Sequence, residues 1–158
     1  MKNLFDITGK VVVITGGTGI LGRAIAAYLA EQGAKVALLG RNVSVGTEIV
    51  GGIKAAGGDA VFIETDVMNR ARLEENLDSV LCRYGSVDVL LNAAGGNMQG
   101  ATIPPESSIF DIDSEDFKRV VELNLIGTVL PTQVFLKPMV EKGAGAIVNF
   151  SSMSAFRP

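Results

Sequence analysis

The 158-residue sequence contains no histidine, no tryptophan and one cysteine. Without histidine the chain lacks the commonest general base and the commonest metal ligand, so neither a metal centre nor a serine–histidine triad is expected. Cys82 lies in a helical pattern and is predicted to be an inert core thiol. The absence of a disulfide framework suits a reducing, cytoplasmic compartment. No apolar run approaches the roughly 18 residues that cross a bilayer, and the N-terminus lacks a signal-peptide pattern, so no membrane association is expected.

The sequence also has no strong excess of either charge. It carries 14 Lys and Arg against 17 Asp and Glu, a formal net charge of −3, and the basic residues are scattered. This pattern does not favour binding to nucleic acid or to an acidic membrane surface. A chain of this length with 47% apolar residues is predicted to form one domain over residues 1–158.

A glycine-rich stretch near the N-terminus organises the rest of the chain. Residues 11–15 are apolar and β-prone, as expected for a strand buried on both faces. Gly17, Gly19 and Gly22 follow at G-x-G-x-x-G spacing, and apolar residues then recur at helical spacing. Such a strand–turn–helix aims unpaired helix amides at whatever lies above the turn, which favours a phosphate. The alternative is a glycine-rich turn that binds nothing.

Each glycine is expected to have its own role. Gly17 is predicted to permit the tight turn, Gly19 to let the backbone approach a pyrophosphate, and Gly22 to let helix and strand pack closely.

Strand and helix patterns alternate five times along the chain, which predicts an α/β fold: a Rossmann-type, doubly wound parallel sheet with helices on both faces. Pro131 and Pro138 are expected to kink and then end the last helix. The expected strands cover residues 11–15, 35–39, 60–64, 87–91 and 146–150, and the expected helices cover 20–32, 43–56, 70–84 and a stretch that begins near Asp113 or Ser114.

Polar residues follow the predicted strands at the edge where ligands bind in such sheets. The end of the second predicted strand, where NAD-preferring folds place an acid, reads Leu38-Leu39-Gly40-Arg41 and contains none. Arg41 can instead meet a 2′-phosphate, which favours NADP over NAD; the alternative is a solvated surface arginine. Asp66 can accept from an adenine amine or form a local Asx-turn. Asn124, on an apolar helix face, either bonds helix to strand or holds a water or catalytic neighbour. Ser152 can donate to a substrate oxygen or serve as a cap.

Together these segments resemble the short-chain dehydrogenase/reductase family over nearly the whole chain. The resemblance implies that Ser152 polarises a substrate hydroxyl or carbonyl, that Asn124 anchors a water in a proton relay, and that hydride passes to or from a nicotinamide. It also implies a homo-tetramer. The residues it assigns to cofactor binding are Thr15, Gly16, Gly17, Thr18, Gly19, Ile20, Leu21, Gly22, Arg41, Asp66, Val67, Asn92, Ala93, Ala94 and Gly95.

The sequence departs from the family pattern in two places. Ile20 stands where the common branch has glycine, so the spacing of the turn resembles the extended branch. The family's Tyr-x-x-x-Lys segment is absent, because Tyr28 and Tyr84 both lie far upstream. We therefore expect residues 1–158 to be the N-terminal part of a longer enzyme, able to bind part of a cofactor but not to turn over.

The loop after Gly95 bears on the substrate. Its neutral side chains suit a polyhydroxylated small molecule, and Gly96 to Met98 together with the final residues resemble the branch labelled D-mannonate oxidoreductase. Arg157 is then expected to meet the carboxylate of a sugar acid, or else to be a surface residue. The alternatives are reduction of another ketone, such as a 3-oxoacyl thioester, or a non-catalytic dinucleotide-binding module.

Overall fold

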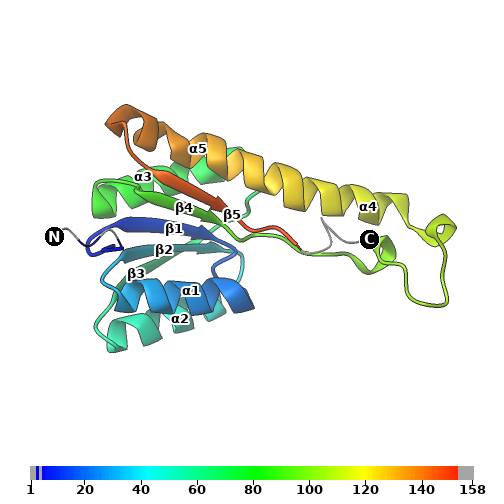
Figure 1. The fold of residues 1–158 in the computed structure, drawn as a ribbon, viewed down its shortest axis with the longest axis horizontal. Helices are drawn as coiled ribbons and strands as arrows, with labels where there is room; N and C mark the ends of the chain where they lie inside the picture. The colour runs from blue at the N-terminus through cyan, green and yellow to red at the C-terminus, as the bar shows by residue number, and fades with distance from the viewer. Residues whose placement is uncertain (1–2, 4, 153–158) are drawn as a thin grey trace.

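A computed structural model describes residue 3 and residues 5–152 of the chain. Its centre is a five-stranded sheet with strand order β3-β2-β1-β4-β5 (Figure 1). Every neighbouring pair is parallel, so the predicted doubly wound architecture is confirmed, and the strand order reverses between β1 and β4. The strands are β1 (Val11–Thr15), β2 (Lys35–Gly40), β3 (Asp59–Glu64), β4 (Val89–Asn92) and β5 (Ala146–Asn149).

The helices begin and end close to where the sequence predicts. Asn42 and Asn69 cap α2 and α3 by accepting from the amides of Val45 and Arg72. Asp113, rather than Ser114, caps α4. The helices are α1 (Ile20–Glu31), α2 (Val43–Ala55), α3 (Arg70–Tyr84), α4 (Ser114–Val121) and α5 (Gly127–Lys142), joined by the 3-10 turns η1 (Gln99–Ala101) and η2 (Ile109–Asp111) and the π-helical segment η3 (Glu122–Ile126).

Two apolar layers hold the helices to the sheet. Successive side chains of β1 point to opposite faces: Val11 and Val13 pack with α3 and α5, whereas Val12 and Ile14 pack with α1 and α2. The two pairs of helices lie on opposite sides of the sheet (Figure 1). All four are at most 2% exposed. Burial of each such side chain stabilises the fold by about 1.5–3 kcal/mol. Because both faces of β1 are covered, its turn into α1 is held rigidly at the carboxyl edge.

The amino edge of the sheet is held by Asp88, which precedes β4. Its carboxylate accepts from the Val11 amide at 2.9 Å and from Lys142 Nζ at 2.7 Å. Partial burial by itself raises the pKa of Asp88, but the Lys142 and Val11 hydrogen bonds and the charges of Lys142 and Lys10 outweigh it. The net pKa of Asp88 therefore lies below its ordinary value.

The last helices differ from the sequence prediction. The prolines were expected to kink and then end a helix, but α5 continues through Pro131 and Pro138 to Lys142, so the predicted end of the helix at Pro138 was wrong. The two interior prolines together cost about 6 kcal/mol, and burial of Val134, Phe135 and Met139, at about 1.5–3 kcal/mol each, is large enough to offset this cost.

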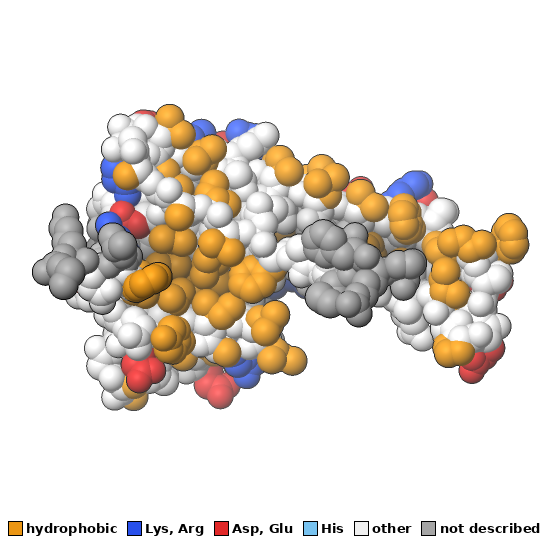
Figure 2. Space-filling model, in the orientation of Figure 1, with side chains coloured by type: hydrophobic (Ala, Val, Ile, Leu, Met, Phe, Trp, Pro, Cys, Tyr) orange, Lys and Arg blue, Asp and Glu red, His pale blue; other side chains and the backbone are white. Residues whose placement is uncertain are grey.

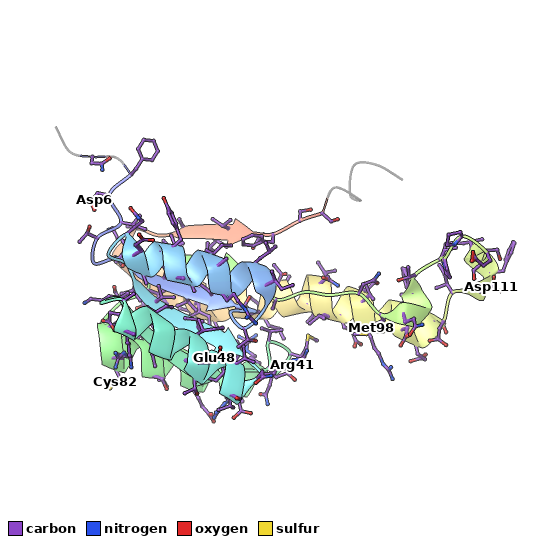
Figure 3. All side chains as sticks on the ribbon, turned by 90° about the horizontal axis from the view of Figure 1, so that it is seen from below. Asp6, Arg41, Glu48, Cys82, Met98 and Asp111 are labelled. Carbon is purple, nitrogen blue, oxygen red and sulfur yellow. The ribbon has the colours of Figure 1, made fainter. Side chains whose placement is uncertain are left out.

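Helix α4 extends beyond the sheet and buries none of its residues among those described (Figure 1). Phe117 is 52% exposed there, so the apolar face of this helix is not part of the core. Hydrophobic side chains also gather over β5 and α1, where Val148, Leu21 and Tyr28 are exposed (Figure 2). Cys82 lies exposed on α3, so the prediction of a buried thiol was wrong (Figure 3). Within the described residues, no helix is long and apolar enough to cross a membrane.

Candidate functional site

The turn between β1 and α1 depends on Gly16 rather than on Gly17. Gly16 has φ +65°, a left-handed conformation that side chains rarely adopt. A Cβ there would also lie 2.6 Å from the carbonyl oxygen of Ala93, so the turn sits directly on the loop after β4. Sequence spacing assigned the tight turn to Gly17, whose φ is not positive, and this assignment is corrected.

The other glycines bring the helix onto the turn. The Gly17 amide donates to the carbonyl of Leu39 at 3.0 Å, which ties the turn to β2. A Cβ on Gly22 would collide with the backbone of Gly16 and Gly17, so Gly22 permits close packing, against the turn rather than the strand. Gly19 is the N-cap of α1, and its amide donates to the Gly16 carbonyl at 2.9 Å.

The first turn of α1 has the features of an anion-binding site. Gly19 supplies no side-chain cap, and the first turn has no acidic residue. The amides of Ile20, Leu21 and Gly22 therefore have neither an intrahelical acceptor nor a capping side chain. Ile20 and Leu21 are 84% and 64% exposed, whereas Gly22 is buried, and of residues 19–22 only Gly19 lines the cleft described below. These amides, which have no partner among the described residues, and the helix dipole both favour a negative group here.

A cleft of about 740 Å³ lies at this carboxyl edge. Its walls come from the glycine turn, the ends of β2 and β3, the loop after β4, and α4 with η3. Among the sequence-predicted residues it is lined by Gly16, Thr18, Gly19, Arg41, Asp66, Val67, Ala93, Ala94 and Gly95. It is also lined by Met98, from the loop that the sequence analysis connects with the substrate. The predicted residues Gly17, Ile20, Leu21 and Gly22 do not line it. The lining residues that sequence reasoning missed are Leu39, Gly40, Asn42, Val43, Thr65, Met68, Arg119, Glu122 and Leu123.

The lining residues that were not predicted differ in whether the sequence could have identified them. Thr65 and Met68 flank the predicted Asp66-Val67 junction, so extending that segment by a residue on each side would have found them. Arg119, Glu122 and Leu123 lie where α4 passes into the π-helical segment. A sequence does not say which side of a projecting helix faces a cleft, and these residues became visible only in three dimensions.

Arg41 stands at one corner of the cleft, between β2 and α2 (Figure 3). Its side chain is exposed, and within the described chain no carboxylate forms an ion pair with it. Asp66 accepts from the Met68 amide at 3.0 Å, which is the Asx-turn predicted as one of its two roles.

Thr15 and Asn92 do not line the cleft; they form hydrogen bonds that fix the backbone beneath it. The Thr15 hydroxyl oxygen accepts from the amides of Ala93 and Ala94, both at 3.2 Å, and so fixes the loop after β4. Asn92 is 3% exposed and donates its amide to Thr132 and Asn149. These two predicted cofactor residues therefore position the backbone and lie under the cleft.

Asn124 bonds the helix to the loop after β4. Its amide donates to the Gly96 carbonyl at 2.7 Å and to the Val120 carbonyl at 2.8 Å, while its oxygen accepts from the Gly96 amide at 3.2 Å. A Cβ on Gly95 would lie 2.7 Å from that oxygen. Asn124 lies in the π-helical segment, a local distortion that is frequent at functional sites.

Ser152 leaves the carboxyl end of β5 and is exposed. Strands β5, β4 and β1 are parallel, and Asn149, Asn92 and Thr15 are in register. Ser152 therefore comes after β5 at the same carboxyl edge of the sheet as the glycine turn. The polar loop after Gly95 uses its side chains internally, since Asn97 donates to Thr102 at 2.8 Å. Of that loop, Met98 reaches the cleft, whereas Asp111 lies far from it at the tip (Figure 3). Arg157 lies outside the described residues.

Comparison with known proteins yields consistent matches. The family model described as short chain dehydrogenase matches residues 10–158. "Uncharacterized oxidoreductase UxuB" of Bacillus subtilis (strain 168) is 41% identical over 161 residues, which is 97% of this chain and 58% of that protein. The chain therefore spans little more than half the length of this relative.

Several matching solved structures carry a bound nicotinamide cofactor, among them the following two. A "putative D-Mannonate oxidoreductase from Haemophilus influenza" with bound NAD matches with a TM-score of 0.89 and 34% identity, covering 97% of this chain and 58% of that one. An actinorhodin polyketide ketoreductase with NADPH matches with a TM-score of 0.84 and 31% identity, covering 94% of this chain and 55% of that one.

Proposed function

Since the chain belongs to the short-chain dehydrogenase family, we propose that residues 1–158 are the dinucleotide-binding part of a single-domain oxidoreductase. The observation that carries this proposal is the first turn of α1, which has no side-chain cap and no acid and whose N-cap residue, Gly19, lines the cleft. When bound, the nicotinamide cofactor supplies the hydride chemistry, and the chain supplies binding and orientation. The residues present fit such a cofactor, because the first turn of α1 offers amides without a side-chain cap and Arg41 offers a cation that has no ion-pair partner among the described residues.

We propose that the pyrophosphate binds at the amides of residues 20–22, beside Gly19, with the 2′-phosphate of NADP at Arg41. NADP is favoured over NAD because Arg41 is an unpaired cation among the described residues at the end of β2, where NAD sites place an acid. The loop at Gly95 and Gly96, fixed by Thr15 and Asn124, then forms the support for the nicotinamide.

The variant Gly19→Asp tests the anion site. Aspartate is a favourable N-cap, so the helix should keep its stability, but its charge occupies the place of the pyrophosphate. We expect NADPH affinity, measured by isothermal titration calorimetry, to fall at least about tenfold. Gln32→Asp places the same charge at the other end of α1 and should leave affinity unchanged. Equal binding by wild type and Gly19→Asp would refute the assignment.

At the substrate end we propose that Ser152 polarises a carbonyl or hydroxyl and that Asn124 organises a proton relay. The best candidate substrate is a sugar acid such as mannonate or fructuronate, supported by the name of the Haemophilus relative. The chain itself is proposed to bind without turnover, because it has no Tyr-x-x-x-Lys segment. A longer form with the length of the relatives should oxidise NADPH with fructuronate, and flat nicotinamide absorbance with both sugar acids and both cofactors would discard this substrate.

We further propose that the working protein is a homo-oligomer, as a tetramer, in a reducing cytoplasm. Support for the oligomer comes from apolar side chains left exposed along α4, η3 and α5, among them Phe117, Leu125 and Val140. Sedimentation of the longer form should give the mass of four chains.

A further inference from the structure

We infer that Thr18 decides whether the end of β2 can carry a side chain, and that it thereby sets cofactor selectivity together with Arg41. This inference rests on the proposed function for its consequence, but its geometry is independent of any ligand. A Cβ built on Gly40 would lie 2.8 Å from Thr18 Oγ1 and 2.9 Å from Thr18 Cγ2. Both distances are shorter than 3.0 Å, a separation that real Cβ atoms essentially never show.

Thr18 has little freedom to move away. It is β-branched, so its side chain prefers few rotamers, and both of its γ atoms already lie against position 40. The backbone on either side is held by hydrogen bonds, from the Gly17 amide to Leu39 and from the Gly19 amide to Gly16. Any side chain at position 40 must therefore rotate Thr18 out of its place or displace the glycine turn.

The consequence concerns the ribose of the cofactor. An acid at the end of the second strand is the group that accepts from the 2′-hydroxyl of NAD. Position 40 ends β2 and lines the cleft beside Arg41, so it is a suitable place for such an acid. With threonine at position 18 this acid fits only if Thr18 rotates out of its place or if the turn beside the proposed pyrophosphate site moves. Thr18 thus disfavours the NAD-selecting residue by its volume.

The geometry is tested first on the apo chain. Gly40→Ala should lower the thermal unfolding midpoint by at least about 3 °C, because it overpacks this corner. In the Thr18→Ala background the same change should cost little, since both γ atoms are gone and the Thr18 Cβ is 3.4 Å away. Equal shifts in the two backgrounds would overturn the steric argument, whatever the chain binds.

The selectivity is tested by calorimetry with NAD and NADP on wild type, Gly40→Asp and Thr18→Ala/Gly40→Asp. Gly40→Asp alone should weaken both cofactors at least about tenfold, whereas the double variant should regain NAD affinity by at least tenfold and stay weak for NADP. If Gly40→Asp alone binds NAD as well as the double variant, Thr18 is not the determinant. If wild type binds neither cofactor, the proposed function fails, and the unfolding comparison still decides the steric claim.

Discussion

Replacing Gly46 with alanine should push α2 away from β3 and disturb the packing of these two elements beside the cleft. Gly46 is buried in α2, three residues after the helix begins. A Cβ there would lie 2.5 Å from Phe62 Cγ and closer still to Cδ2 and Cε2 of the same ring. Carbon atoms in contact are normally about 3.5–4.0 Å apart, so ring and helix must separate by more than about 1 Å.

The magnitude follows from a comparison within the same helix. Gly51 is also in α2, but a Cβ on it would meet nothing within 4 Å. Alanine is a better helix former than glycine, so Gly51→Ala should stabilise the chain by about 0.5–1 kcal/mol. The same gain applies to Gly46→Ala and cancels in the difference. What remains is overpacking against Phe62, about 1–3 kcal/mol.

Far-UV circular dichroism is the suitable assay, because the chain has no tryptophan to report unfolding. Gly46→Ala should unfold roughly 2–10 °C below Gly51→Ala. Adding Phe62→Ala to each variant should remove most of that difference, since the colliding ring is then absent. If Gly46→Ala and Gly51→Ala unfold at the same temperature, the close packing of α2 on β3 described here is wrong.

Three further predictions concern the cleft and the amino edge. Arg41→Ala should weaken NADP by about tenfold and leave NAD within about twofold, measured by calorimetry; an unchanged ratio would remove Arg41 from the site. Asp88→Asn should cost about 1–3 kcal/mol at pH 7 in urea unfolding, and the difference should shrink below about pH 4, because a carboxyl with a depressed folded pKa loses its contribution as pH falls through that value. A gap that persists at pH 2 would contradict this. Thr15→Val should cost about 1–3 kcal/mol by leaving the amides of residues 93 and 94 without an acceptor, whereas Thr15→Ser should cost less.

Local signals in the sequence were sufficient for most of the fold. The apolar run at residues 11–15 is β1 as predicted, and Asn42, Asn69 and Gly85 begin or end helices where expected. These features depend on a few neighbouring residues, through capping bonds and the left-handed conformation of glycine. The prolines of α5 show the limit of such reasoning, because their local cost is outweighed by burial against strands distant in the sequence.

Some residues of the candidate site could likewise be placed from the sequence, and others could not. Gly19, Arg41 and Asp66 could be placed at one edge from sequence alone, because strands that alternate with helices put all their carboxyl ends together. The part played by Gly16, by Asn124 and by the Thr18–Gly40 contact required coordinates. Each of these depends on the distance between segments that are far apart in the chain.

The sequence by itself determined the order of strands and helices and the position of the glycine turn, because periodicity, caps and glycine spacing act over a few residues. The resemblance of its motifs to those of a known family indicated the family. Tertiary structure alone decided which glycine bends the chain, that Asn92 and Thr15 lie beneath the cleft, and that α4 contributes a wall to it. The physical reason is that packing distances and the facing of a helix are set by contacts across the sheet, which no local pattern records.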